Sequence, residues 1–358
     1  MLVNAKEIER RESTAAASTA AAPQRVAVFD LGSNSFHMIV AEVADDGRIR
    51  ILDRARQMVR LGMQTLEQGI ISPDAFQRGL GALRVLHERA AMQRPHVTLA
   101  VGTSALREAS NGGEFVEAVR AALGLDVRVI DGIEEAELVY RGARQALALE
   151  GRRVALFDVG GGSTEVILGQ EEGYLFTTSL RLGVLRLRDR WAYSDPPTPR
   201  ECAVMADWAW TVLKPAIDCV REKGFDFVAL TSGTALALGR IVGDELPPVQ
   251  RVGAGELCSP QPFAGGYGNP VRVPIITAPR FRLRLSALIK WEARLARATA
   301  RERSERWGIE TGRAESIVPG IIIVRTIFEL MGVDEAQVCG AALREGLIAD
   351  WAALPRLA

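Results

Sequence analysis

Two short segments of this chain carry the same residues at the same spacing, and both could bind a phosphate group. Residues 30–35 and 158–163 each obey the pattern Asp-x-Gly-x-x-Ser, each follows a short apolar run, and each precedes a second one. This pattern predicts two β-hairpins with tight turns whose backbone N–H groups converge on an anion. Because Asp and Gly are ordinary hairpin residues, one copy alone would indicate a plain hairpin equally well. The repetition favours two phosphate-binding turns that face each other across a cleft.

The residues of these turns divide into candidate metal ligands and candidate phosphate ligands. An Asp cannot bind phosphate directly, but it can hold a Mg²⁺ ion or its water shell beside the phosphate. Asp30 and Asp158 are therefore the candidate metal ligands. The candidate phosphate ligands of the two turns are Gly32, Ser33, Asn34, Ser35, Gly160, Gly161, Gly162 and Ser163.

Two further segments could also contact phosphate. Residues 102–108 follow a predicted strand, and residues 231–234 form a third Gly/Ser/Thr turn at the start of a predicted helix. A guanidinium group matches phosphate oxygens bidentately, so Arg107 is the predicted side-chain clamp. The alternative is a surface arginine that pairs with Glu108. These segments add four candidate phosphate ligands, namely Thr103, Ser232, Gly233 and Thr234.

The elements that must position these residues repeat in the two halves of the chain. Apolar spacing predicts the order β-β-β-α-β-α-β-α in the first half, and the second half begins in the same way. Ser72 before Pro73 and the capping box at Thr198 indicate helix starts. Expected strands cover 26–30, 36–43, 47–61, 97–101, 127–130, 154–158, 164–168, 174–179 and 227–230. Expected helices begin near 73, 113, 131, 184, 199, 232, 283, 317 and 341.

The composition bounds the class of protein. A length of 358 residues is typical of two domains, and 48% apolar residues suffice for sizeable hydrophobic cores. Its 44 basic and 44 acidic side chains cancel, so no global field attracts nucleic acid or an acidic membrane. Four scattered cysteines without neighbouring histidines favour the reducing cytoplasm, and no run of 18 apolar residues predicts a membrane span.

Three longer segments together resemble one known family. Residues 30–38, 102–109 and 158–165 are similar to the motifs of the exopolyphosphatase / guanosine pentaphosphate phosphohydrolase (Ppx/GppA phosphatase) family, within the actin-like, sugar-kinase and Hsp70 ATPase superfold. Further segments that are similar to the family lie at 132–137, 179–187, 231–234 and 343–347. The resemblance extends from about residue 25 to residue 350.

The resemblance implies an α/β fold of two actin-like (ribonuclease H-like) domains, whose mixed five-stranded sheets face a central cleft. It places domain I at 24–135 and domain II at 136–340, with a disordered tail at 1–23 and a C-terminal helix, 341–358, that packs back on domain I. The chain departs from the family in three features. Longer members carry extra helical C-terminal domains, residues 244–279 match nothing, and Leu187-Arg188 replaces the usual Leu-Thr.

The resemblance also implies the chemistry, which is attack of water on a terminal phosphoryl group with the assistance of Mg²⁺ or another divalent cation. Glu165 then corresponds to the base or water-positioning carboxylate, although a solvated strand-edge glutamate is the alternative. Glu135 corresponds to the second catalytic glutamate, although carboxylates also favour the first turn of a helix. The expected enzyme is a phosphoanhydride hydrolase.

Several alternatives stay open at this point. The substrate is either inorganic polyphosphate or guanosine pentaphosphate, because both activities use the same residues. A kinase would need an adenosine pocket and an acceptor-activating Asp, and a non-catalytic polyphosphate or alarmone sensor would not need Glu135 and Glu165. The basic run at 280–306 indicates a solvated face or a track for a long polyanion. The resemblance makes a homodimer plausible, and neither nucleic acid nor membrane is expected as a partner.

Overall fold

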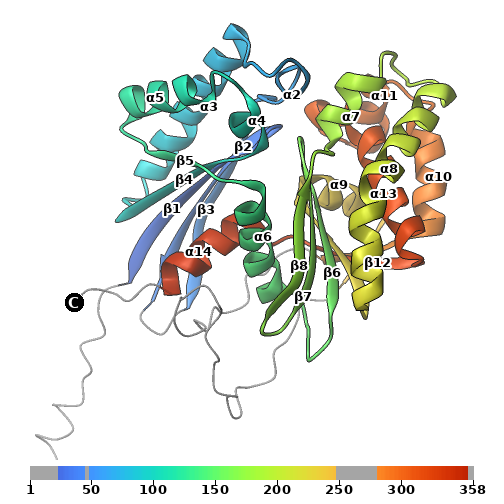
Figure 1. The fold of residues 1–358 in the computed structure, drawn as a ribbon. Coiled ribbons are helices and arrows are strands. Elements are labelled where there is room, and N and C mark those ends of the chain that lie inside the picture. Colours follow the sequence, from blue (N-terminus) through green and yellow to red (C-terminus); the bar gives the residue numbers. More distant parts are fainter. Residues whose placement is uncertain (1–22, 45–47, 247–279, 354–358) are drawn as a thin grey trace, which may run out of the picture.

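The structure, a computed structural model, describes residues 23–44, 48–246 and 280–353. Within them the chain folds into two α/β halves, each built on one mixed sheet (Figure 1). The tail expected at 1–23 and the loop expected at 244–279 lie almost wholly outside the described residues.

The first half contains the expected five-stranded sheet in the order β3-β2-β1-β4-β5. The hairpins β1–β2 and β2–β3 are antiparallel, whereas β4 and β5 continue the sheet in parallel. The strands are β1 (Gln24–Leu31), β2 (Ser35–Val43), β3 (Ile49–Met58), β4 (Val97–Gly102) and β5 (Val127–Val129). The helices are α2 (Thr65–Gln68), α3 (Pro73–Ala91), α4 (Ser104–Glu108), α5 (Gly112–Leu123) and α6 (Gly132–Ala146).

The second sheet has seven strands, so the expected five is wrong for this half. Its order, β10-β11-β12-β9-β6-β7-β8, repeats the five-strand plan of the first sheet from β8 to β12 and adds two strands at the edge. In β11 the arginines alternate with buried Phe281 and Leu283, a period of two that is typical of a strand, so this part of the predicted basic run is an edge strand of the sheet. The strands are β6 (Val154–Val159), β7 (Thr164–Gln170), β8 (Gly173–Leu180), β9 (Phe227–Thr231), β10 (Asp244–Glu245), β11 (Arg280–Arg284) and β12 (Glu335–Cys339).

The helices of the second half follow the sequence signals at their starts. The Thr198 side chain accepts from the N–H of Glu201, and the predicted capping box is present, just as Ser72 caps α3. The helix expected at 283–299 corresponds to α10, and a second capping box at Thr299 starts a further helix, α11, that the sequence analysis does not predict. The helices are α7 (Val184–Trp191), α8 (Pro199–Lys223), α9 (Ser232–Val242), α10 (Leu285–Leu295), α11 (Ala300–Trp307), α12 (Thr311–Ala314), α13 (Ile317–Met331) and α14 (Leu343–Ala353).

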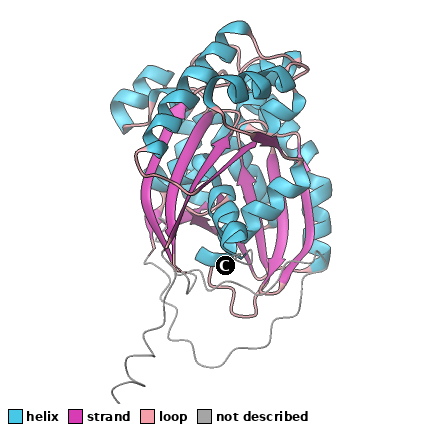
Figure 2. Cartoon of the chain, turned by 90° about the vertical axis from the view of Figure 1, so that its left-hand side faces the viewer, coloured by secondary structure: helices cyan, strands magenta, loops and turns pink. Residues whose placement is uncertain are grey.

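Two helices, α6 and α14, lie between the sheets, as Figure 1 and the perpendicular view in Figure 2 show. They share one buried apolar cluster with the facing sides of both sheets, which includes Val28, Leu138, Leu156 and Leu347. Because helices cover both faces, the central strands β1 and β6 are almost continuous apolar runs. The domain boundary predicted between residues 135 and 136 falls within α6, and α14 packs against α6, β1 and β2.

The crossing of α6 and α14 depends on two glycines. A Cβ atom on Gly142 would collide with the carbonyl oxygen of Ala342, and one on Gly346 would collide with that of Leu138. The backbones of α6 and α14 are therefore in direct contact, although the two helices are far apart in the sequence. Among the described helices, none combines the length and apolar character needed to cross a bilayer.

Candidate active site

The pairing of strands turns the repeated motif into a row of side chains on each sheet. In the first sheet Asp30 lies opposite His37 across the β1–β2 hairpin. In the second sheet Asp158 lies opposite Glu165, which in turn lies opposite Ser179. Directly opposed residues in a ladder point to the same face, so each Asp shares its face with the residue seven positions later.

The two turns predicted to bind phosphate, 32–35 and 160–163, touch each other; they are called the first and the second phosphate turn below. A Cβ atom on Gly161 would stand 3.1 Å from the Cβ of Ser33 and 3.3 Å from the backbone N of Asn34. The backbone of segment 59–62 forms hydrogen bonds with the first turn. In one of them the N–H of Arg60 donates to the carbonyl oxygen of Asn34 at 2.8 Å. In the second turn Gly160 N donates to the carbonyl of Ser163 at 3.0 Å. The predicted pair of facing turns is therefore present in the fold.

The second phosphate turn also touches the segment that contains Thr103. A Cβ atom on Gly162 would collide with the hydroxyl of Ser104, next to the buried Thr103. The other predicted ligands of the two turns lie at this junction, where Ser33, Ser35 and Ser163 are buried and Gly32, Asn34 and Gly160 are half-buried.

Both predicted catalytic glutamates are buried and lie near each other. Glu135 occupies the first turn of α6, which Asp131 caps by accepting from the backbone N–H groups of Ile133 and Glu134. Glu165 accepts a hydrogen bond from Ser179 Oγ at 2.8 Å. The two meet because α6 begins against β8, where a Cβ on Gly132 would stand 2.5 Å from that of Ser179.

Burial and mutual repulsion shift the titration of this group of carboxyls. Burial, followed by the charge of Glu165, raises the pKa of Glu135 well above its usual value, and Arg107 opposes the shift. Burial and the charge of Asp158 raise the pKa of Glu165 to about 7, against hydrogen bonds from Ser179 and Ser163. A cluster of this kind, in a cleft, is typical of a functional site.

The predicted metal ligands belong to the same cluster. Burial raises the pKa of Asp30 to about 6, although Arg344 opposes the shift. Burial, then the charges of Glu135 and Asp30, raise that of Asp158 to about 7. The part of the chain that the structure describes holds no group of three His, Cys, Asp or Glu side chains arranged to bind a metal ion. Mg²⁺ needs only one or two carboxylates when substrate phosphates and water complete its shell, so the two aspartates fit it.

Arg107 does not form the ion pair with Glu108 that is the alternative to its predicted role as a phosphate clamp. Its Nη1 donates to the carbonyl of Ile130 at 2.7 Å and to Glu135 Oε2 at 3.0 Å. The suggested pairing with Glu108 is absent, because Glu108 is bound by Arg186 instead. Arg107 therefore aligns one of the predicted catalytic glutamates.

The third turn adjoins Asp158 and faces an arginine that the sequence does not single out. Its first residue, Thr231, pairs with Asp158 in the β6–β9 register. Ser232 Oγ accepts from Thr234 N at 3.1 Å, which caps α9. A Cβ atom on Gly233 would stand 2.7 Å from Nη2 of Arg313. Within the described residues the buried Arg313 guanidinium forms no hydrogen bond or ion pair, and burial lowers its pKa to about 10.

Comparison with known proteins decides the family. A sequence profile of the Ppx/GppA phosphatase family matches residues 38–354. The chain belongs to this family. Both the family and the actin-like α/β fold expected from the sequence are confirmed, as is the expectation of a hydrolase.

Relatives within the Ppx/GppA phosphatases carry two different names. Exopolyphosphatase 1 of Mycobacterium leprae is 28% identical, over 90% of this chain and 88% of that protein. A guanosine-5'-triphosphate,3'-diphosphate pyrophosphatase of Vibrio atlanticus is 32% identical, over 92% of this chain and 60% of that protein. The crystal structure of an exopolyphosphatase from Cytophaga hutchinsonii is similar with a TM-score of 0.78 at 25% identity, and covers 92% of this chain and 98% of that one.

In this Ppx/GppA phosphatase a buried arginine joins the second phosphate turn to the first half. Arg186 in α7 donates through Nε to the carbonyl of Gly162 at 3.2 Å and through Nη1 to that of Leu66 at 2.9 Å. Its Nη2 binds Glu108 at 2.7 Å, and Ser104 Oγ donates to the same carboxylate at 2.9 Å. No local residue pattern predicts this network, because its members come from four separate segments.

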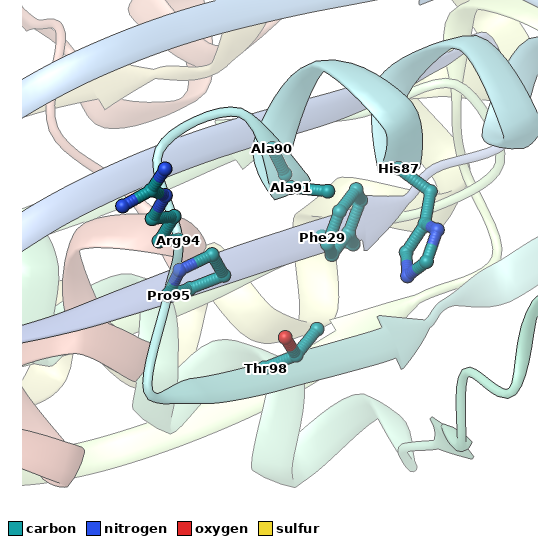
Figure 3. Close-up of a pocket in the computed structure, with 7 residues that line it drawn as sticks. All are labelled: Phe29, His87, Ala90, Ala91, Arg94, Pro95 and Thr98. Carbon is teal, nitrogen blue, oxygen red and sulfur yellow. The ribbon is translucent and has the colours of Figure 1, made fainter.

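A cavity of about 300 Å³ lies on the other face of the first sheet (Figure 3). Phe29 and His87 line it together with the end of α3. Because successive side chains of a strand point to opposite faces, Phe29 faces this cavity and Asp30 faces away from it. The cavity is therefore separate from the carboxylate cluster.

Proposed function

We propose that this chain is an exopolyphosphatase, which hydrolyses the terminal phosphoanhydride of inorganic polyphosphate and releases orthophosphate. The observation that carries the proposal is the meeting of two glycine- and serine-rich turns beside four carboxyl groups, of which Glu135 and Glu165 are buried and Asp30 and Asp158 are half-buried. Convergent backbone N–H groups suit a phosphate, and paired carboxylates suit activation of water rather than binding of a polyanion. A pure binding protein would have no use for this charge repulsion, which disfavours the sensor alternative.

In this mechanism the turns at 32–35 and 160–163 hold the terminal phosphate groups in line with the attacking water. Glu165 accepts the proton of that water, since a base with a pKa near the working pH combines availability with driving force. Glu135, aligned by Arg107, positions the same water. Arg107 has further N–H groups that do not bind Glu135, and these donate to a phosphate oxygen.

Asp30 and Asp158 are the residues that would hold Mg²⁺, which when bound neutralises charge on the reacting phosphate oxygens. The mutual repulsion of these two aspartates supports this role, because a divalent cation between them relieves it. The third turn, with Ser232, Gly233 and Thr234, binds phosphates further along the substrate. Arg313 supports this role, because it adjoins Gly233 and its guanidinium group has no hydrogen-bond or ion-pair partner among the described residues.

The second candidate is hydrolysis of guanosine pentaphosphate, which the name of the Vibrio relative supports. The mycobacterial exopolyphosphatases favour the first candidate, because the similarity extends over most of their length. Phosphate release from long polyphosphate, short polyphosphate and guanosine pentaphosphate, measured side by side with Mg²⁺, separates the two. We expect the highest kcat/KM on polyphosphate; a higher value on guanosine pentaphosphate would reverse the assignment. Cytoplasmic location and a homodimer stay predictions of the sequence.

A further inference from the structure

Three side chains form a hydrogen-bonded relay from the last helix to the first phosphate turn. Nη1 of Arg344, at the start of α14, lies 2.7 Å from Nδ1 of His37. Nε2 of the same imidazole lies 3.0 Å from Oγ of Ser35, the last residue of the Asp-x-Gly-x-x-Ser motif. His37 is therefore held at both ring nitrogens, by a helix on one side and by a substrate-binding turn on the other.

The chemistry of the first contact fixes the direction of the second. A guanidinium group can only donate, so Nδ1 of His37 must accept and cannot carry a proton. The neutral imidazole then carries its hydrogen on Nε2 and donates it to the hydroxyl oxygen of Ser35. Burial, together with the charges of Arg344, Arg56 and Arg313 that face the ring, lowers the pKa of His37 well below its usual value, which agrees with a neutral ring.

We propose that His37 is a positioning residue that occupies one acceptor site of the Ser35 hydroxyl and thereby leaves its proton free to be donated to a substrate phosphate. The corresponding serine of the second repeat, Ser163, lies close enough to Glu165 to lower the pKa of its carboxyl group. Of the two motif serines, Ser35 is thus the phosphate donor and Ser163 the support of the base. The phosphate in this inference rests on the proposed function, whereas the relay itself does not.

The relay is tested first without any substrate. The chain has three histidines, so a long-range ¹H–¹⁵N correlation spectrum of the whole enzyme contains three imidazoles, and the His37→Gln variant assigns one of them. We expect the Nε2–H tautomer for His37 in the parent, and a mixture of tautomers in Arg344→Met. An Nδ1–H tautomer or a doubly protonated ring in the parent would overturn the relay.

The role of the relay is tested by a double-mutant cycle with inorganic polyphosphate. Asparagine places its amide near the former Nδ1 and glutamine near the former Nε2, so His37→Asn loses the donor to Ser35 whereas His37→Gln keeps it. We expect Ser35→Ala and His37→Asn each to raise KM about tenfold with kcat changed much less. His37→Gln should raise KM less than His37→Asn. His87→Gln, on the far face of the sheet, serves as the control with parental kinetics.

Because His37 acts through Ser35, the double variant should be no worse than Ser35→Ala alone. Multiplication of the two KM effects would contradict the proposal, since His37 would then act independently of the serine. An enzyme that shows the expected tautomer but hydrolyses no polyphosphate would refute the proposed function. In that case the same cycle is run on equilibrium binding of polyphosphate, where additive losses would overturn the role of His37.

Discussion

The hairpins β1–β2 and β6–β7 have the same backbone plan but different chemistry at one position. Each carries an Asp at the end of its first strand and, directly opposite and seven residues later, a side chain on the same face. In the second hairpin this side chain is Glu165, an acceptor that two serine hydroxyls support. In the first it is His37, a neutral donor fixed by Arg344. We therefore expect different roles at this one position, with Glu165 acting on the attacking water and His37 supporting phosphate binding through Ser35.

The strongest test of this division removes the base from the second hairpin. Glu165→Gln keeps the shape of the side chain but cannot accept a proton, so we expect kcat to fall by about 10²–10⁴ with affinity for polyphosphate kept or slightly improved. Steady-state kinetics and equilibrium binding of polyphosphate measure the two effects separately. Glu171→Gln, in the exposed turn after β7, is the matched control. Near-parental turnover in Glu165→Gln would refute the assignment and bring the sensor alternative forward.

The next test concerns Glu135, the predicted catalytic carboxylate that lies outside the two hairpins, in the first turn of α6. Glu135→Gln should lower kcat in the same direction but less, by about 10–10³, because Arg107 and Glu165 remain. The neighbouring Glu134 pairs with Arg128 at the surface, so Glu134→Gln controls for the substitution itself. An equal fall of kcat in Glu134→Gln and Glu135→Gln would indicate that both substitutions disturb the start of α6 and that Glu135 has no specific part in the reaction.

The equivalence of the two motif aspartates is tested through the metal. Asp30→Asn and Asp158→Asn each remove one ligand charge, and we expect the Mg²⁺ concentration for half-maximal activity to rise about tenfold in both. Chelation with EDTA should abolish activity of the parent and Mg²⁺ should restore it. An unchanged Mg²⁺ requirement in one variant would show that only one hairpin holds the ion.

The smallest effect is expected in stability. Burial raises the pKa of Asp158 above its usual value, so the folded protein favours the protonated form. Its contribution to the free energy of unfolding is fully present below about pH 4 and is lost as the pH rises through about 7. We therefore expect Tm without metal to fall by several degrees from pH 5 to pH 8. Asp158→Asn should flatten this profile, and a steeper fall in the variant would contradict the shift.

The sequence predicts local geometry well because it carries the repeated turns in full. Asp30 to Ser35 and Asp158 to Ser163 contain their own hairpin signals, and the caps at Ser72 and Thr198 fix helix starts within one residue. The first sheet followed from these elements. The sequence does not predict strand β11, because the outward-facing arginines outnumber the inward-facing Phe281 and Leu283. The segment therefore resembles a charged surface run.

The partners of the site residues could not be predicted, since they depend on how distant elements pack. Arg107 meets Glu135 only because β5 brings α6 back beside α4, and nothing in residues 102–108 marks that contact. Arg313 reaches Gly233 from a short helix without a motif. His37 is the exception, because its position can be recognised from the repeat: it follows Asp30 by seven residues, as Glu165 follows Asp158.

The relay from Arg344 also sets an order of events during synthesis of the chain. His37 and Arg344 are 307 residues apart, and α14, which directly follows strand β12 of the second sheet, crosses α6 between the two sheets. A nascent chain therefore completes the backbone of its first phosphate turn early but lacks the guanidinium that orients the turn until residue 344 is added. Contacts of such long sequence separation form late in folding. A ribosome-bound or C-terminally clipped chain would accordingly fold in large part and still lack a finished binding site.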